Sequence, residues 1–200
     1  MTNNFEQIRS LLKLEDDYFY FIQIIQRKKE IPELGSNNRV IRSYMISTLD
    51  KFDKCKDEII SMCKHYNARA YIHLNRRKWN RISLECLRHT AELIANGQHD
   101  AIKSSLETVI GRHNCEPTDS RTWIVDIDTK DSIVLDRIVN VIEALAVRPK
   151  ILSCLTTKNG YHLITEKFDT QTFNKHLSLQ GDTSLQVDIH KDNPTILYIP

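Results

Sequence analysis

Acidic residues stand two positions apart in the segment Trp123-Ile-Val-Asp-Ile-Asp128. The segment is short and alternating, which predicts a β-strand, and residues i and i+2 of a strand point to the same face. We therefore expect Asp126 and Asp128 to project together while Val125 and Ile127 enter a core. Two such carboxylates repel each other, and hard divalent cations such as Mg²⁺ or Mn²⁺ relieve that repulsion. An ordinary pair of aspartates at a strand end would also explain the pattern.

A second segment of interest is Thr156-Thr-Lys-Asn-Gly-Tyr-His162. Its Asn159-Gly160 pair predicts a tight hairpin turn. Such a turn presents backbone N–H groups, hydroxyls such as that of Thr157, and the Lys158 ammonium, which are groups that suit a triphosphate. His162 follows on the returning strand and is expected to point at the same ligand. A plain hairpin with an exposed histidine is the alternative.

The third segment is Val187-Asp-Ile-His-Lys191, in which Asp188 and His190 alternate with apolar residues. Both polar side chains are therefore expected on one face of a strand. A third carboxylate from Asp188 would complete a site for two divalent cations. A charged residue that keeps an edge strand soluble is the other interpretation.

The elements that must position these segments follow a regular order from residue 121 onward. Strands are expected at 122–128, 151–156, 161–165, 185–190 and 195–199, and helices after Ser132 and after Asp169. The order β-α-β-β-α-β-β predicts an α+β fold, an RRM-like antiparallel sheet module with helices on one face. The last strand is expected to turn back beside the one before it.

An αβ unit precedes this module, with a strand at 70–75 and helices at 79–94 and 101–110. The first 65 residues carry apolar side chains at helical spacing, among them Phe19, Ile22 and Ile25. The sequence therefore predicts a helical N-terminal extension, residues 1–66, and a second domain, residues 67–200. Within the latter, the αβ unit takes 67–120 and the RRM-like module 121–200.

Composition limits the class of protein. The chain has 200 residues, of which 40% are hydrophobic and 27% charged, which indicates a globular protein rather than a disordered one. No apolar run approaches the length of a membrane helix, so no membrane association is expected. The five cysteines include no CxxC pair, which favours a reducing compartment, and we expect a cytoplasmic protein. Cys63-x-His65 and Cys86-x-x-His89 fit no common zinc module.

Charge is unevenly distributed although the net charge is only +2. Between Lys64 and Arg88 there are seven basic residues against the single acid Glu85. Four of the basic residues surround Trp79 where the expected strand gives way to a helix: Arg76, Arg77, Lys78 and Arg81. Cations beside an aromatic ring suit a single-stranded nucleic acid. A solvated basic face, with Trp79 as a core anchor, would look the same.

Taken together and in this order, IVDID, TKNGYH and VDIH resemble the three signatures of the archaeo-eukaryotic primase superfamily. That family has a hydrophobic strand ending in DxD, a small-residue-x-His motif and a hydrophobic-Asp motif. The resemblance covers Arg121 to Pro200, extends back towards Ala70, and is closest to the small primase-polymerases of phages and plasmids. One departure is Gly160-Tyr161-His162, which stands where the family commonly has Ser-x-His.

The resemblance implies template-directed nucleotidyl transfer, primer synthesis in the DNA replication of a phage or mobile element. Asp126, Asp128 and Asp188 would be catalytic and would bind two Mg²⁺ or Mn²⁺ ions. His162 would contact the triphosphate of an NTP or dNTP. Because they lie in the turn just before His162, Lys158, Thr157 and Asn159 are expected to bind the same nucleotide. A single-stranded DNA template would lie on Arg76, Arg77, Lys78 and Arg81. A replicative helicase is a further expected partner.

Two other functions use the same residues differently. A metal-dependent nuclease could employ the carboxylates, but no (D/E)-x-K partner follows them, since Asp188 and Lys191 are one residue too far apart. A non-catalytic accessory that binds single-stranded nucleic acid could use an RRM-like sheet, but such sheets carry aromatic residues where this one carries acids.

Overall fold

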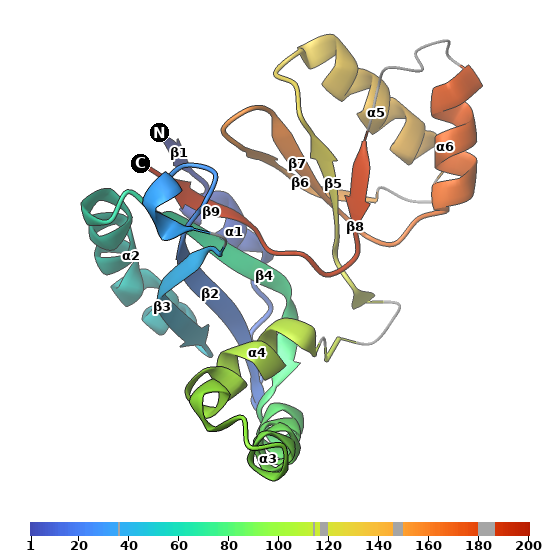
Figure 1. Ribbon diagram of the computed structural model, residues 1–200. Coiled ribbons are helices and arrows are strands. Elements are labelled where there is room, and N and C mark those ends of the chain that lie inside the picture. The colour runs from blue at the N-terminus through green and yellow to red at the C-terminus, as the bar shows by residue number, and fades with distance from the viewer. Residues whose placement is uncertain (36, 114, 117–119, 146–149, 180–186) are drawn as a thin grey trace.

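The computed structural model describes residues 1–35, 37–113, 115–116, 120–145, 150–179 and 187–200. The described strands form two antiparallel sheets (Figure 1). Sheet A has the order β1-β9-β4-β2-β3, with β1 Thr2–Asn3, β9 Thr195–Ile199, β4 Arg69–Lys78, β2 Tyr18–Gln26 and β3 Arg39–Ile46. Sheet B has the order β6-β7-β5-β8, with β6 Ile151–Thr156, β7 Tyr161–Thr165, β5 Trp123–Ile127 and β8 Asp188–His190.

Helices cover both sheets, so the chain is α+β, as expected. The α-helices are α1 Phe5–Leu11, α2 Leu49–His65, α3 Trp79–Ala95, α4 Ser105–Arg112, α5 Ser132–Ala144 and α6 Thr170–Leu179. Short 3₁₀ helices lie at Pro32–Leu34 (η1) and His99–Ser104 (η2). No described helix combines the length and the apolar character that crossing a bilayer requires.

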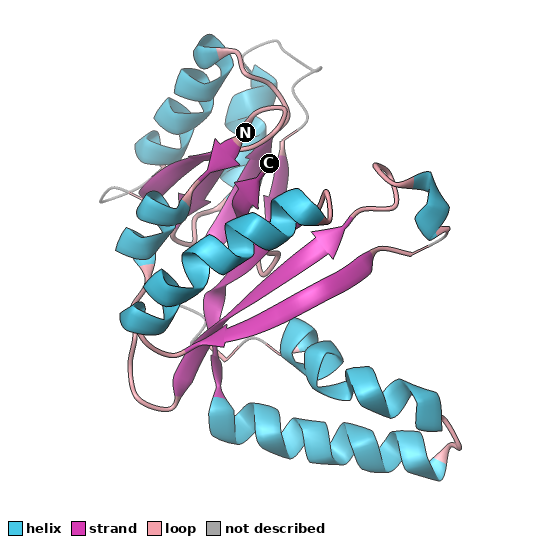
Figure 2. Cartoon of the chain, turned by 90° about the vertical axis from the view of Figure 1, so that its left-hand side faces the viewer, coloured by secondary structure: helices cyan, strands magenta, loops and turns pink. Residues whose placement is uncertain are grey.

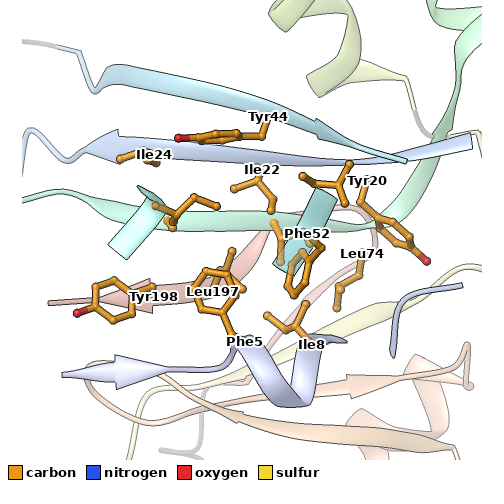
Figure 3. Packing of buried hydrophobic residues seen from close by; sticks show 14 of the residues in the cluster. Phe5, Ile8, Tyr20, Ile22, Ile24, Tyr44, Phe52, Leu74, Leu197 and Tyr198 are labelled. Carbon is orange, nitrogen blue, oxygen red and sulfur yellow. The ribbon is translucent and has the colours of Figure 1, made fainter. Parts of the chain in front are cut away.

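One face of sheet A packs on α1 and α2. Alternate residues of β2, such as Ile22 and Ile24, meet Phe5 of α1 and Phe52 and Ile59 of α2 in the main core (Figure 3). The Thr48 hydroxyl caps the start of α2 by accepting a hydrogen bond from the Lys51 backbone N–H. This core holds β2 and β4 in place, and both strands also contribute residues to a cleft on the other face of the sheet.

The other face of sheet A is divided. At one end, Phe19 and Phe21 of β2 pack with Ile82 of α3 and with Val109 and Ile110 of α4. These two helices lie side by side beneath the sheet (Figure 2). At the other end the face carries Ile25 and Tyr71, which border a cleft instead of a helix.

Sheet B carries α5 and α6 on one face. Trp123, Val125 and Ile127 of β5 pack against these helices together with Ile138 and Phe173. The alternation expected from the sequence is confirmed, because the residues between them lie on the opposite face. Asp169 caps α6 by accepting hydrogen bonds from the backbone N–H groups of the next turn. The start of the expected strand at 185–190 lies outside the described residues, and β8 begins at Asp188.

The prediction that residues 195–199 turn back beside β8 is wrong. After β8 the chain leaves sheet B, and β9 joins sheet A between β1 and β4, where Tyr198 lies opposite Ala70. Its residues Leu197 and Tyr198 are buried in the main core, which the apolar faces of α1 and α2 complete. Burying these apolar side chains between β1 and β4 of sheet A is more favourable in free energy than leaving them at an edge position beside the three-residue β8.

The prediction of a helical extension at residues 1–66 is also wrong. Phe19, Ile22 and Ile25 belong to β2, which lies between β3 and β4 inside sheet A. Among the described residues of this segment, only those of α1 and α2 are α-helical. Apolar residues occur at almost every position of β2 because both faces of this strand are covered, and the alternation that marks a half-exposed strand is therefore absent.

Candidate functional site

A cleft of about 980 Å³ lies between the two sheets. Sheet B and its β6–β7 turn supply one wall, and sheet A with the loop after β2 supplies the other. The first wall includes Asp126, Asp128, Thr157, Lys158, Asn159 and His162, and the second includes Arg27, Lys29, Glu30, Arg69 and Tyr71.

Carboxylates line the wall made by sheet B. Asp126 is on β5 and Asp128 follows that strand directly, and both line the cleft, as the spacing predicts. Asp188 is the cross-strand partner of Asp126, so its side chain leaves the sheet on the same face. Asp188 is exposed and is not among the described residues that line the cleft. Within the described chain, no three acidic, histidine or cysteine side chains converge as a ready cation site.

His162 lies opposite Asp126 on β7, and its ring connects the two sheets. The His162 Nε2 atom is 3.3 Å from Asp126 Oδ1, and its Nδ1 is 2.8 Å from the Thr195 hydroxyl of β9. A neutral ring fits both contacts if Nε2 donates to the carboxylate and Nδ1 accepts from Thr195. The hydrogen bond from His162 lowers the pKa of Asp126, although burial opposes it. Asp126 is therefore an ionised carboxylate at neutral pH.

The β6–β7 turn packs directly on the end of β5. The Gly160 backbone N–H donates to the Thr157 hydroxyl at 3.0 Å, and the Thr157 N–H donates to the Gly160 carbonyl at 2.9 Å. A Cβ atom at Gly160 would lie 1.9 Å from the Ile127 carbonyl oxygen and 2.7 Å from the Thr129 nitrogen. This close approach explains why residue 160 is a glycine. Lys158 and Asn159 of the same turn line the cleft together with Asp128.

Cations line the wall made by sheet A. Arg27 and Lys29 follow β2, and Arg69 begins β4. Among them Glu30 accepts hydrogen bonds from Arg69 and from Lys158 of the opposite wall. The cleft thus places carboxylates on one wall opposite guanidinium and ammonium groups on the other. This distribution suits a phosphate ligand that contacts the basic side chains directly and the carboxylates through bound metal ions.

The four residues expected to bind a template lie elsewhere, and none is among the described residues that line the cleft. Arg77 is fully buried, where it donates to the Ile110 carbonyl oxygen and pairs with Asp192. Arg76 is buried in an ion pair with Glu116. Lys78 is half-exposed, and Arg81 is exposed on α3. Only these last two are accessible to a polyanion.

The sequence motifs do not include the cations on the sheet A side of the cleft. Arg27, Lys29 and Glu30 belong to the segment predicted as a helical extension, and Arg69, which pairs with Glu30, lies at the start of the predicted αβ unit. A visible signal existed in the run Arg27-Lys28-Lys29, three adjacent basic residues after an apolar strand.

The carboxylates fit a divalent cation by their chemistry. Mg²⁺ and Mn²⁺ prefer carboxylate oxygens. Asp126 and its cross-strand partner Asp188 leave sheet B on one face, and Asp128 follows Asp126 by two positions. Asp126 is already ionised, which metal binding requires.

Comparison with family models, with curated proteins and with solved structures found no match to this chain.

Proposed function

We propose that the protein is a template-directed nucleotidyltransferase, a DNA primase or primase-polymerase. One observation carries the proposal: the DxD carboxylates, the histidine of the second motif and the turn before it meet on one wall of a single cleft. The cleft volume of about 980 Å³ is in the range of small-molecule sites and accommodates a nucleotide. The strand order β6-β7-β5-β8, with both helices on one face, supports the RRM-like part of the proposal.

Asp126, Asp128 and Asp188 would hold two Mg²⁺ or Mn²⁺ ions, which supply Lewis-acid stabilisation of the charge that develops during phosphoryl transfer. The chain's own groups orient the substrate. Lys158 neutralises part of the charge of the outer phosphates, and the Asn159 side chain of the same turn lines the cleft beside it. The Nε2–H group of His162 turns from the Asp126 carboxylate to donate to a phosphate oxygen. A bond then forms between the attacking 3′-oxygen and the α-phosphorus, pyrophosphate leaves, and the hydroxyl proton passes to solvent.

The test is nucleotide incorporation on single-stranded DNA with Mg²⁺ or Mn²⁺, on bare and primed templates, with NTPs and dNTPs supplied separately. We expect Asp126→Asn to lower incorporation at least about a hundredfold, because a lost metal ligand removes several kcal/mol of transition-state stabilisation. Asp136→Asn is the matched control, since Asp136 is exposed on α5 on the far face of sheet B.

Other outcomes favour other functions. Equal activity of the Asp126→Asn variant and the wild type overturns the proposal. Loss of the DNA strand in the presence of metal but without nucleotides would indicate a nuclease. Tight, salt-sensitive and metal-independent binding of single-stranded DNA without turnover would indicate an accessory protein.

A further inference from the structure

Glu30 joins the two walls of the cleft. Its carboxylate accepts a hydrogen bond from Arg69 Nε at 3.0 Å and another from Lys158 Nζ at 3.2 Å. Arg69 begins β4 in sheet A, whereas Lys158 belongs to the β6–β7 turn of sheet B. Glu30 itself lies in the loop after β2, so one acidic side chain connects cations from two separate sheets.

The two cations differ in how firmly they are held. Arg69 is 8% exposed and its guanidinium contacts both carboxylate oxygens of Glu30, a fork geometry that fixes the pair. The Lys158 side chain is 60% exposed and makes one contact to Glu30. A single exposed ion pair is worth little, so Lys158 exchanges partners readily while Arg69 does not.

Glu30 is charged at neutral pH. Burial alone would raise its pKa, but the hydrogen bonds from Arg69 and Lys158 outweigh burial, and the pKa of Glu30 is lowered. The ion pair also stands where the cleft meets a second cavity of about 580 Å³, because Lys29, Glu30, Arg69 and Lys158 line both. A ligand that reaches Lys158 therefore competes with a permanent carboxylate.

We infer that Glu30 is a specificity-determining residue. Its carboxylate is the counter-ion of Lys158 when no ligand is bound, and only a much more highly charged anion displaces this carboxylate from Lys158. A monophosphate carries about two negative charges on a single group, whereas a triphosphate carries about four along one chain and therefore competes better with the Glu30 carboxylate. Glu30 thereby selects triphosphates over monophosphates. The inference rests on the proposed function only in assigning phosphate ligands to the cleft.

The test uses two probes that carry no base, inorganic tripolyphosphate and orthophosphate, titrated into the full chain by calorimetry. We expect Glu30→Gln to bind orthophosphate roughly two- to fivefold more tightly than the wild type, the range for removing an exposed competing ion pair. Affinity for tripolyphosphate should rise by a smaller factor, so selectivity falls. Glu33→Gln is the matched control, because Glu33 is exposed, lies three positions away and carries the same charge.

A second variant guards against misfolding of Glu30→Gln. The exposed Lys158→Gln should weaken tripolyphosphate binding more than orthophosphate binding, and adding Glu30→Gln to it should have no further effect. The inference is overturned if Glu30→Gln behaves like Glu33→Gln, if its effect persists without Lys158, or if tripolyphosphate binds no variant. Altered selectivity without DNA synthesis overturns the proposed function alone, and synthesis with unaltered selectivity overturns the role of Glu30 alone.

Discussion

Gly160 shows how a single backbone position sets the geometry of the site. Its Cα hydrogen faces the backbone of Ile127 and Thr129, and no side chain fits between them. We expect Gly160→Ala to lower the free energy of unfolding by about 1–3 kcal/mol, the cost of overpacking a fixed backbone contact. Urea denaturation measures this change.

Gly111→Ala is a suitable comparison, because nothing lies within 4 Å of a Cβ placed at Gly111, a helical position. Alanine is there expected to stabilise or to leave stability unchanged. Similar behaviour of the two variants would contradict the close approach at Gly160.

His73 is a buried imidazole whose ionisation links stability to pH. Its side chain is buried on β4, and its Nδ1 is 3.2 Å from an Arg77 guanidinium nitrogen. Burial, and then the positive charge of Arg77, lower the pKa of His73 to about 3. The unfolded chain takes up a proton near pH 6.5 but the folded chain does not. This group therefore stabilises the fold above pH 6.5, and that contribution is lost as pH falls towards 3.

We expect the free energy of unfolding to fall by about 1.4 kcal/mol per pH unit below pH 6 on account of His73. His73→Gln should flatten the profile between pH 6 and pH 4.5, because glutamine takes up no proton in that range. Urea denaturation at several pH values checks this. His99→Gln, on an exposed histidine, should leave the slope unchanged. An equally steep profile in both variants would rule out His73 as the cause.

At the scale of elements, Asn75 ties β4 to sheet B. Its buried side-chain amide donates to the carbonyl oxygens of Thr122 and Lys191, and its Oδ1 accepts from the Thr122 N–H at 2.8 Å. Thr122 precedes β5, which carries the DxD motif, and Lys191 follows β8. One side chain thus positions the strands of all three candidate carboxylates.

We expect Asn75→Ala to destabilise the protein by about 2–3 kcal/mol, because three hydrogen bonds between a buried amide and partly buried backbone groups are lost at once. Thermal unfolding monitored by circular dichroism would detect this. Asn80→Ala, at an exposed position of α3, is the matched control and should change stability little. Equal melting temperatures of the two variants would show that the Asn75 hydrogen bonds contribute nothing net.

The elements that the sequence predicted well are those with local signals. The β6–β7 hairpin, the alternation in β5 and the helix α3 each follow from residues within a few positions of one another. The pairing of β9 with β4 and the burial of Arg77 depend on partners more than one hundred positions away. The basic run at 76–78 therefore indicated a nucleic-acid surface, whereas distant acids neutralise it in the fold.

At the scale of the whole molecule, the cleft requires both sheets. Asp126 and Asp128 come from the end of β5 in sheet B, whereas Arg27, Lys29 and Arg69 come from sheet A and the loop after β2. Ile124, Leu155 and Ile164 of sheet B belong to the same core as α1 and α2, and β9 returns the chain from sheet B to sheet A. The two sheets therefore share one core, although the motifs occupy only the second half of the sequence, and we expect them to unfold as one unit.

A fragment of residues 67–200 tests this unity, because it keeps all three motifs. It removes β1, β2 and β3 together with α1 and α2, so β4 loses its neighbour β2 and Ile72 loses the partners that bury it. The lost apolar contacts and the newly exposed strand edge leave too little to offset chain entropy. We expect the fragment to show no cooperative thermal transition, while the full chain unfolds in a single one. A soluble fragment that melts cooperatively would instead show that residues 67–200 fold without residues 1–66. The cations that residues 1–66 contribute to the cleft would then not be needed for sheet B to fold.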